Sequence, residues 1–251
     1  MTFIGIDPTA GQKPFCYAAL DHELRPIALG AGRLDEILAF SAGQRQAVIA
    51  VCSPRRPNQG VMTRQEVRQQ LNPLPASGRW VDFRLADYLL RQRNIVIPQT
   101  PSDLSVCPKW MQMGFSLYAH LEKLGYRTYP IDGAELQTLE VYPHASFTAL
   151  MKKIPFPKYT LEGRLQRQLV LYENNIRLPD PMRFFEEITS HKLLKGILPT
   201  ENLYSAGELD ALVAAYTAWL AVTRPKDVLL LGDAQEGQIV LPTGELEFHY
   251  T

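Results

Sequence analysis

Cysteine is scarce in this chain of 251 residues, and its three cysteines, Cys16, Cys52 and Cys107, lie far apart. They are too few for a disulfide framework and show no Cys-x-x-Cys metal spacing, so we expect reduced thiols in a cytoplasmic protein. Long hydrophobic runs are also absent, because none approaches the ~18 residues of a membrane span. A strand-like segment directly follows Met1, so we expect neither a signal peptide nor a membrane partner.

The chain has no net charge, with 26 Lys+Arg against 26 Asp+Glu, which argues against a protein that coats long stretches of nucleic acid. The charges are nevertheless unevenly placed. Residues 55–93 carry eight basic and three acidic groups, whereas residues 199–251 carry two basic and eight acidic groups. The basic segment indicates a local anionic or protein partner, and the alternative is two solvated faces. No glycine-rich phosphate loop is present.

Apolar residues make up 46% and charged residues 21% of the chain, as in ordinary globular proteins. We expect one α/β domain over residues 1–251. Short strands are predicted at 2–6, 15–20 and 26–30, the last two forming a hairpin. The all-apolar segment 47–51 predicts an inner strand covered on both faces. It should lie beside strand 2–6, because both are short and end in a polar residue followed by proline.

The remainder of the chain alternates irregular and regular stretches. Residues 53–108, rich in proline and arginine, predict an insertion lying over the sheet edge, with short helices at 63–71 and 85–91. The later apolar patterns predict helices at 109–124, 161–172, 181–194 and from Ser205, and strands at 127–131, 136–142, 228–231 and 238–241. Ser205 and Glu208 have the spacing of a capping box.

Three acids stand at the ends or in the interior of these elements. Asp7 ends the first strand, Glu140 lies in an apolar strand, and Asp210 is in the first turn of the last long helix. Carboxylates from separate elements can together bind Mg²⁺ or Mn²⁺, as in phosphoryl-transfer enzymes. The alternatives are a turn former, an edge-strand charge and a partner of the helix dipole.

Several basic residues suggest contacts with an anionic substrate. Lys158, Arg164 and Arg167 form one basic motif, in which Arg164 and Arg167 are neighbours on a helix surface. Together with Arg84 they are the predicted substrate-binding residues, and the alternative is a solvated helix face. His144 follows Glu140 by four residues and is either an acid–base group or a surface histidine.

The motifs occur in a characteristic order: Gly5-Ile6-Asp7, strand 47–51 with Ser53-Pro54, Arg84-x-x-Asp87, Glu140-Val141-Tyr142-Pro143, Lys158-x-x-x-x-Gly163-Arg164-x-x-Arg167, Leu209-Asp210-Ala211 and Glu236-Gly237-Gln238. This series resembles the domain-of-unknown-function 429 (DUF429) family, described as predicted nucleases of the ribonuclease H-like fold. The resemblance spans residues 4–242. It implies a mixed central sheet, with the first three strands antiparallel, flanked by helices. It also implies a metal-dependent phosphodiester hydrolase acting on DNA or RNA, with Asp7, Glu140 and Asp210 as catalytic residues and ligands of Mg²⁺ or Mn²⁺.

One position departs from the family pattern. Where the family has Ile-Asp-Ala-Pro, this chain has Val51-Cys52-Ser53-Pro54, and a thiol is a poor ligand for Mg²⁺. We therefore keep three hypotheses. The first is a weakened nuclease that prefers Mn²⁺, and the second is a lapsed member of the fold that binds nucleic acid or protein. The third is an actin-like phosphotransferase, for which the glycine-rich hairpins are missing. Convergence of the three carboxylates would favour the enzyme. Cys52 as a nucleophile is a further alternative.

Overall fold

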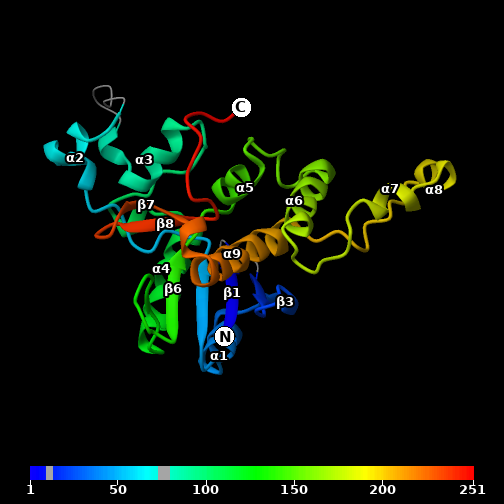
Figure 1. The fold of residues 1–251 in the computed structure, drawn as a ribbon, viewed down its shortest axis with the longest axis horizontal. Helices are drawn as coiled ribbons and strands as arrows, with labels where there is room; N and C mark the ends of the chain where they lie inside the picture. The colour runs from blue at the N-terminus through cyan, green and yellow to red at the C-terminus, as the bar shows by residue number, and fades with distance from the viewer. Residues whose placement is uncertain (10–13, 73–79) are drawn as a thin grey trace.

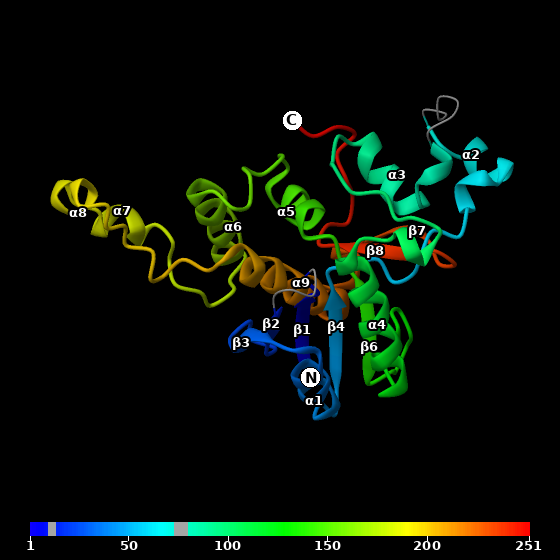
Figure 2. The same cartoon turned by 180° about the vertical axis from the view of Figure 1, so that it is seen from behind.

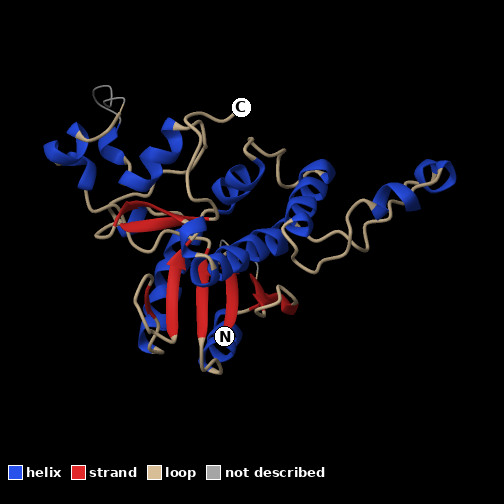
Figure 3. Cartoon of the chain, in the orientation of Figure 1, coloured by secondary structure: helices blue, strands red, loops and turns tan. Residues whose placement is uncertain are grey.

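A mixed sheet of eight strands forms the centre of the computed structural model, which describes residues 1–9, 14–72 and 80–251 (Figures 1 and 3). Its strands are β1 (Thr2–Asp7), β2 (Phe15–Leu20), β3 (Pro26–Gly32), β4 (Ala47–Val51), β5 (Arg127–Thr128), β6 (Leu136–Glu140), β7 (Leu229–Asp233) and β8 (Gly237–Leu241). Their order is β3-β2-β1-β4-β6-β8-β7, with β5 beside β6. The first three strands are antiparallel, whereas β4 and β6 run parallel to β1.

The pairing of β1 with β4 confirms that the two apolar strands are neighbours, with Ile6 opposite Val51. All five residues of β4 are buried, because helices cover both faces of this inner strand. The mixed sheet, the antiparallel start and the flanking helices agree with the expected α/β class and are consistent with a ribonuclease H-like arrangement.

Helices lie on both sides of the sheet and within the insertion (Figure 2). They are α1 (Leu34–Ala42), α2 (Gln65–Gln69), α3 (Leu85–Gln92), α4 (Lys109–Lys123), α5 (Pro143–Met151), α6 (Leu161–Glu173), α7 (Arg183–Glu187), α8 (Ser190–Leu194) and α9 (Ala206–Thr223). One face of the sheet packs on α9, and the other packs on α1 and α4. Helix α9 crosses β1 so closely that a Cβ at Gly5 would lie 1.9 Å from the Ala211 carbonyl oxygen. Only glycine permits this approach.

Some predicted elements differ from the observed ones. The helix predicted at 181–194 is two short helices, because Ile188 is extended and the Thr189 side chain caps the second one. The strand predicted at 127–131 is paired only over 127–128. Helix α5 was not predicted and begins with proline at Pro143. In the insertion, α3 packs against the edge strand β7, while residues 73–79, including Arg79 of the basic segment, lie outside the described residues.

None of the helices in the described ranges combines the length and the apolar character that crossing a membrane requires.

Candidate functional site

Two of the predicted acids, Asp7 and Asp210, meet where β1 ends against the first turn of α9. Side chains alternate along a strand, so Asp7 points to the same face as Gly5, which is the face that α9 covers. The capping box of Ser205 and Glu208 fixes the start of α9, with the Ser205 amide donating to the Glu208 carboxylate at 2.7 Å. Asp210 is therefore held in place two residues later, with only 3% of it exposed.

The two carboxylates repel one another in a poorly solvated place. Burial raises the pKa of Asp7 to about 7, the negative charge of Asp210 adds to the effect, and Lys158 opposes it. Burial also raises the pKa of Asp210, although the Lys158 ammonium, with Nζ 2.6 Å from Oδ2, partly offsets this. At neutral pH Asp7 consequently exchanges a proton readily, a property that suits an acid–base group.

Two thiols flank Asp7 on the neighbouring strands. Cys16 is paired with Asp7 in the register of β1 and β2, and burial together with the Asp7 charge raises its pKa to about 11. Cys52 follows β4, and its Sγ lies 3.7 Å from the Asp210 carbonyl oxygen. Burial and then the Asp7 charge raise the pKa of Cys52 well above the usual value. Both thiols are therefore protonated at neutral pH, which disfavours a nucleophilic cysteine.

A cavity of about 370 Å³ adjoins Asp210 and is lined on one side by Lys158, His144 and Arg167. Arg167 is 2% exposed; one terminal nitrogen donates to Phe156 O at 2.7 Å, while its buried Nε has no partner. Burial, Arg167 and Lys158 together lower the pKa of His144 to about 4. The positive side of this cavity is thus suited to an anionic group.

Glu140 does not join the other two acids, so the convergence of three carboxylates that would favour the enzyme is not observed. It aligns with Val51, whose side chain packs with α4 on the sheet face opposite α9. There it binds Arg84, with Oε1 2.6 Å from a guanidinium nitrogen, and it accepts the Arg55 amide at 2.9 Å. Arg84 also binds Asp87 at 2.8 Å. Because side chains alternate between the two faces along β6, Glu140 lies on the face of the sheet opposite Asp7 and Asp210.

Two of the four predicted substrate-binding residues, Arg84 and Arg164, lie outside the lining of the cavity beside Asp210. Arg84 is fully buried between Glu140 and Asp87, where an anionic substrate has no access to it. Arg164 donates to the carbonyl oxygens of Tyr204 and Leu203 at 2.8 and 2.7 Å, and so holds the loop that leads into α9. Lys158 and Arg167 remain beside Asp210, and the prediction that they bind substrate stays a prediction.

The donor set at the pair does not fit a two-ion centre. Asp7 and Asp210 supply carboxylates, but Lys158 already binds Asp210, and Cys52 places a protonated thiol where the family pattern has an acid. Hard divalent cations need more oxygen ligands than this. Across the described ranges, the structure contains no group of three or more His, Cys, Asp or Glu side chains arranged to hold a metal ion.

Some residues of this region were not singled out by the sequence. Cys16 could have been found by pairing strand 2–6 with strand 15–20, which sets it opposite Asp7. Glu236 belongs to the last motif of the series, but the sequence gave no indication of its role. It is fully buried and accepts the backbone amides of Gln59, Val61 and Leu85 at 3.1, 2.9 and 2.9 Å, so it organises the insertion.

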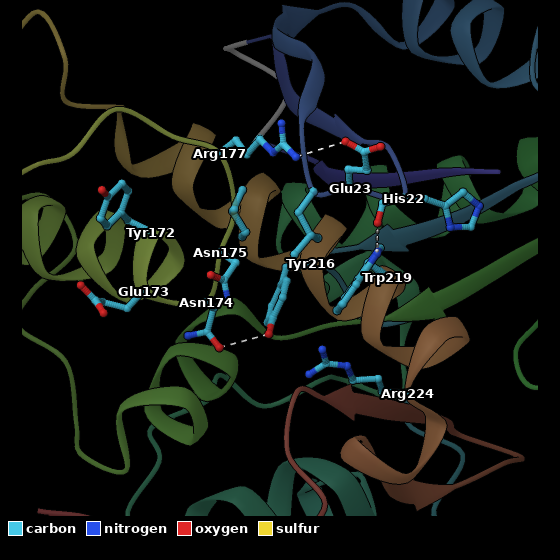
Figure 4. A pocket seen from close by; sticks show the side chains of 12 residues that line it. His22, Glu23, Tyr172, Glu173, Asn174, Asn175, Arg177, Tyr216, Trp219 and Arg224 are labelled. Carbon is cyan, nitrogen blue, oxygen red and sulfur yellow. Dashed lines mark hydrogen bonds and ion pairs between the residues drawn. The ribbon is translucent and has the colours of Figure 1, made fainter.

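A larger groove of about 710 Å³ lies farther along α9, lined by Tyr216 and Trp219 (Figure 4). These residues follow Asp210 by six and nine positions, or roughly 9 and 13 Å along the helix axis. The Tyr216 hydroxyl is hydrogen-bonded to Asn174 at 3.1 Å, and the Trp219 indole donates to the His22 carbonyl at 3.0 Å. These two polar groups of the groove are already paired, so the smaller cavity beside Asp210 is the better candidate for chemistry.

Comparison with known proteins gives one finding. The family model described as "Protein of unknown function (DUF429)" matches residues 5–235. No curated protein and no solved structure matches the chain.

Proposed function

The chain belongs to the DUF429 family, and we propose from its own site that it hydrolyses phosphodiester bonds in nucleic acid. The observation that carries this proposal is the pair of Asp7, whose pKa is about 7, and Asp210, which lines a cavity together with Lys158 and Arg167. A base that titrates near the working pH is effective in general catalysis. Lysine and arginine are the usual partners of phosphate oxygens.

The proposed reaction uses the chain's own groups. Ionised Asp7 takes a proton from water, whose oxygen attacks phosphorus, and the ester oxygen leaves with a proton from solvent. Lys158 and Arg167 hold the phosphate oxygens; Asp210 keeps Lys158 in place, with Nζ and Oδ2 2.6 Å apart. Such preorganised charge stabilises a transition state in which negative charge develops.

An assay on nucleic acids tests this proposal. Labelled single-stranded and double-stranded DNA and RNA are incubated with the protein in Mg²⁺, Mn²⁺ or EDTA, since either ion stays a prediction from the sequence. We expect Asp7→Asn and Asp210→Asn to lower cleavage by about 100-fold or more. Asp35→Asn, on the exposed start of α1, is the matched control and should cleave as the unchanged protein does.

The same assay can contradict the proposal. Cleavage that survives Asp7→Asn would move the reaction away from this pair, and an absence of cleavage in all three conditions would reject the hydrolase. Cys52→Asp adds the acid of the family pattern. A gain in Mn²⁺-dependent cleavage on this change would place position 52 in the site, whereas unchanged activity and metal affinity would remove it.

A second candidate is a binding module that does not cleave. It is favoured by the Lys158–Asp210 ion pair, which neutralises one acid, and by Cys52 in place of another. This candidate predicts that nucleic acid binds without turnover and that Arg167→Gln weakens the binding. Fluorescence anisotropy of labelled oligonucleotides, measured beside the cleavage assay, separates the two.

A further inference from the structure

Residues 179–199, here named the arm, project from the body of the molecule between α6 and α9 (Figure 1). The arm contains α7 and α8, each of five residues. Neither helix packs extensively against another helix or strand in the part of the chain that the structure describes. Helices this short have almost no stability in water by themselves, so their order requires a covering surface.

The arm also exposes an unusual amount of apolar surface. Leu194 is 89% exposed, and Phe185 is 56% exposed. The large hydrophobic side chains of the arm that face solvent are Met182, Phe185, Leu193, Leu194, Ile197 and Leu198. Scattered exposed leucines are normal in soluble proteins, but a concentration of this kind within one projecting segment marks an interaction surface.

The charges of the arm are divided between its halves. Residues 180–187 have a net charge of −2, and residues 188–199 have a net charge of +2. The acids and bases responsible are Asp180, Glu186, Glu187 and Arg183 in the first half, and Lys192 and Lys195 in the second. None of them forms an ion pair within the described residues. A two-fold axis would set each acidic half against a basic half, so the arm is complementary to itself.

The area available is sufficient for a stable contact. The chain exposes 12663 Å² of surface. A compact monomer of its mass would expose about 11,200 Å², which leaves an excess of about 1,400 Å². Each partner in a standard protein interface buries about 800 Å². The chain therefore exposes more surface than a compact monomer by an amount larger than one side of a dimer requires, and the projecting arm contributes to this excess.

We propose that two copies of this chain dimerise by pairing their arms antiparallel about a two-fold axis. Helix α7 of each copy then lies against α8 of the other, and the exposed apolar side chains are buried between them. The partner is a second copy because the charge pattern matches itself.

Reversing the charge of one half of the arm tests this arrangement. In Glu186→Lys/Glu187→Lys and in Lys192→Glu/Lys195→Glu, both halves of the arm carry the same sign. Sedimentation velocity should show the unchanged protein as a dimer and each variant with a dimer dissociation constant about tenfold higher or more. A mixture of the two variants should restore dimers, because each acidic half again meets a basic half.

Two further measurements keep the test decisive. Phe185→Ser/Leu194→Ser should give monomers that lose in circular dichroism only the helical signal of α7 and α8, since the arm packs little against the body. An unchanged protein that stays monomeric at high concentration would overturn the proposal. Charge variants that dimerise normally, or whose mixture forms no dimers, would overturn the antiparallel arrangement.

Discussion

The central sheet carries buried carboxylates on both faces, and the two clusters are built differently. On the α4 face, Glu140 and Asp87 share the buried Arg84, with contacts of 2.6 and 2.8 Å. On the α9 face, one lysine, Lys158, lies near both Asp7 and Asp210, and it forms its ion pair with Asp210. Thr100 and the Arg55 amide complete the hydrogen bonds of the first cluster. Asp7 has a thiol on either side.

The difference separates a structural role from a chemical one. A carboxylate that binds an arginine and accepts backbone amides has its oxygens occupied by hydrogen bonds, and it orders the elements around it. A carboxylate pushed against another carboxylate in a buried place has a raised pKa, and its proton moves easily near neutral pH. The candidate site is therefore better identified by a carboxylate that lacks a balancing cation than by the number of acids in a cluster.

The largest change in stability is expected from a substitution in the cluster on the α4 face, where Arg84 balances two carboxylates. Arg84→Met leaves Glu140 and Asp87 buried without their cation, and removing one partner of such a cluster costs about 3–5 kcal/mol. Urea denaturation should show this as a lower free energy of unfolding. Arg25→Gln, at an exposed ion pair, is the control and should cost less than about 1 kcal/mol. Equal losses in both variants would contradict the comparison.

Substitution of Asp7 is expected to raise the free energy of unfolding, whereas substitution of Arg84 lowers it. Its pKa is about 7 in the folded chain against 3.8 in the unfolded chain, so the folded state binds more protons between these values. Stability therefore falls as pH rises through this window. Asp7→Asn removes the penalty and should stabilise the protein by about 2–4 kcal/mol at pH 8, and by little at pH 4. Unfolding midpoints measured across this range check the slope, and a destabilised variant at pH 8 would reject the raised pKa.

The smallest effect is a shift in one titration. His144 has a pKa of about 4, because burial, Arg167 and Lys158 all disfavour its charged form. Inorganic phosphate bound in the cavity would neutralise part of this positive field and raise that pKa. NMR titration of the His144 ring, with and without phosphate, measures the change. An Arg167→Gln variant should have a higher pKa without phosphate and a smaller response to it.

Local sequence patterns predicted much of the fold and part of the candidate site. The apolar segment 47–51 identified the inner strand, and the capping box at Ser205 identified the start of α9. Asp7 ends the first strand and Asp210 lies in the first turn of the last long helix, and these positions indicated that the two acids could lie close together. Glu140 was misassigned because the face of a strand depends on its register, and a shift of one residue reverses every side chain. Arg84 looked like a substrate residue because sequence carries no measure of burial.

The sheet is joined unevenly, because β6 pairs with β8 at a single position, Glu140 opposite Ile239. On one side of this joint, β4 and β6 are paired along five residues; on the other, β7 and β8 form a hairpin that packs on α3. Such a seam divides a molecule into units that open separately unless side chains hold them together. Glu140 is bonded across the seam to Arg84, which precedes α3. We expect this ion pair to help join the two units in cooperative unfolding, and amide hydrogen exchange in β7 and β8 would report its loss first.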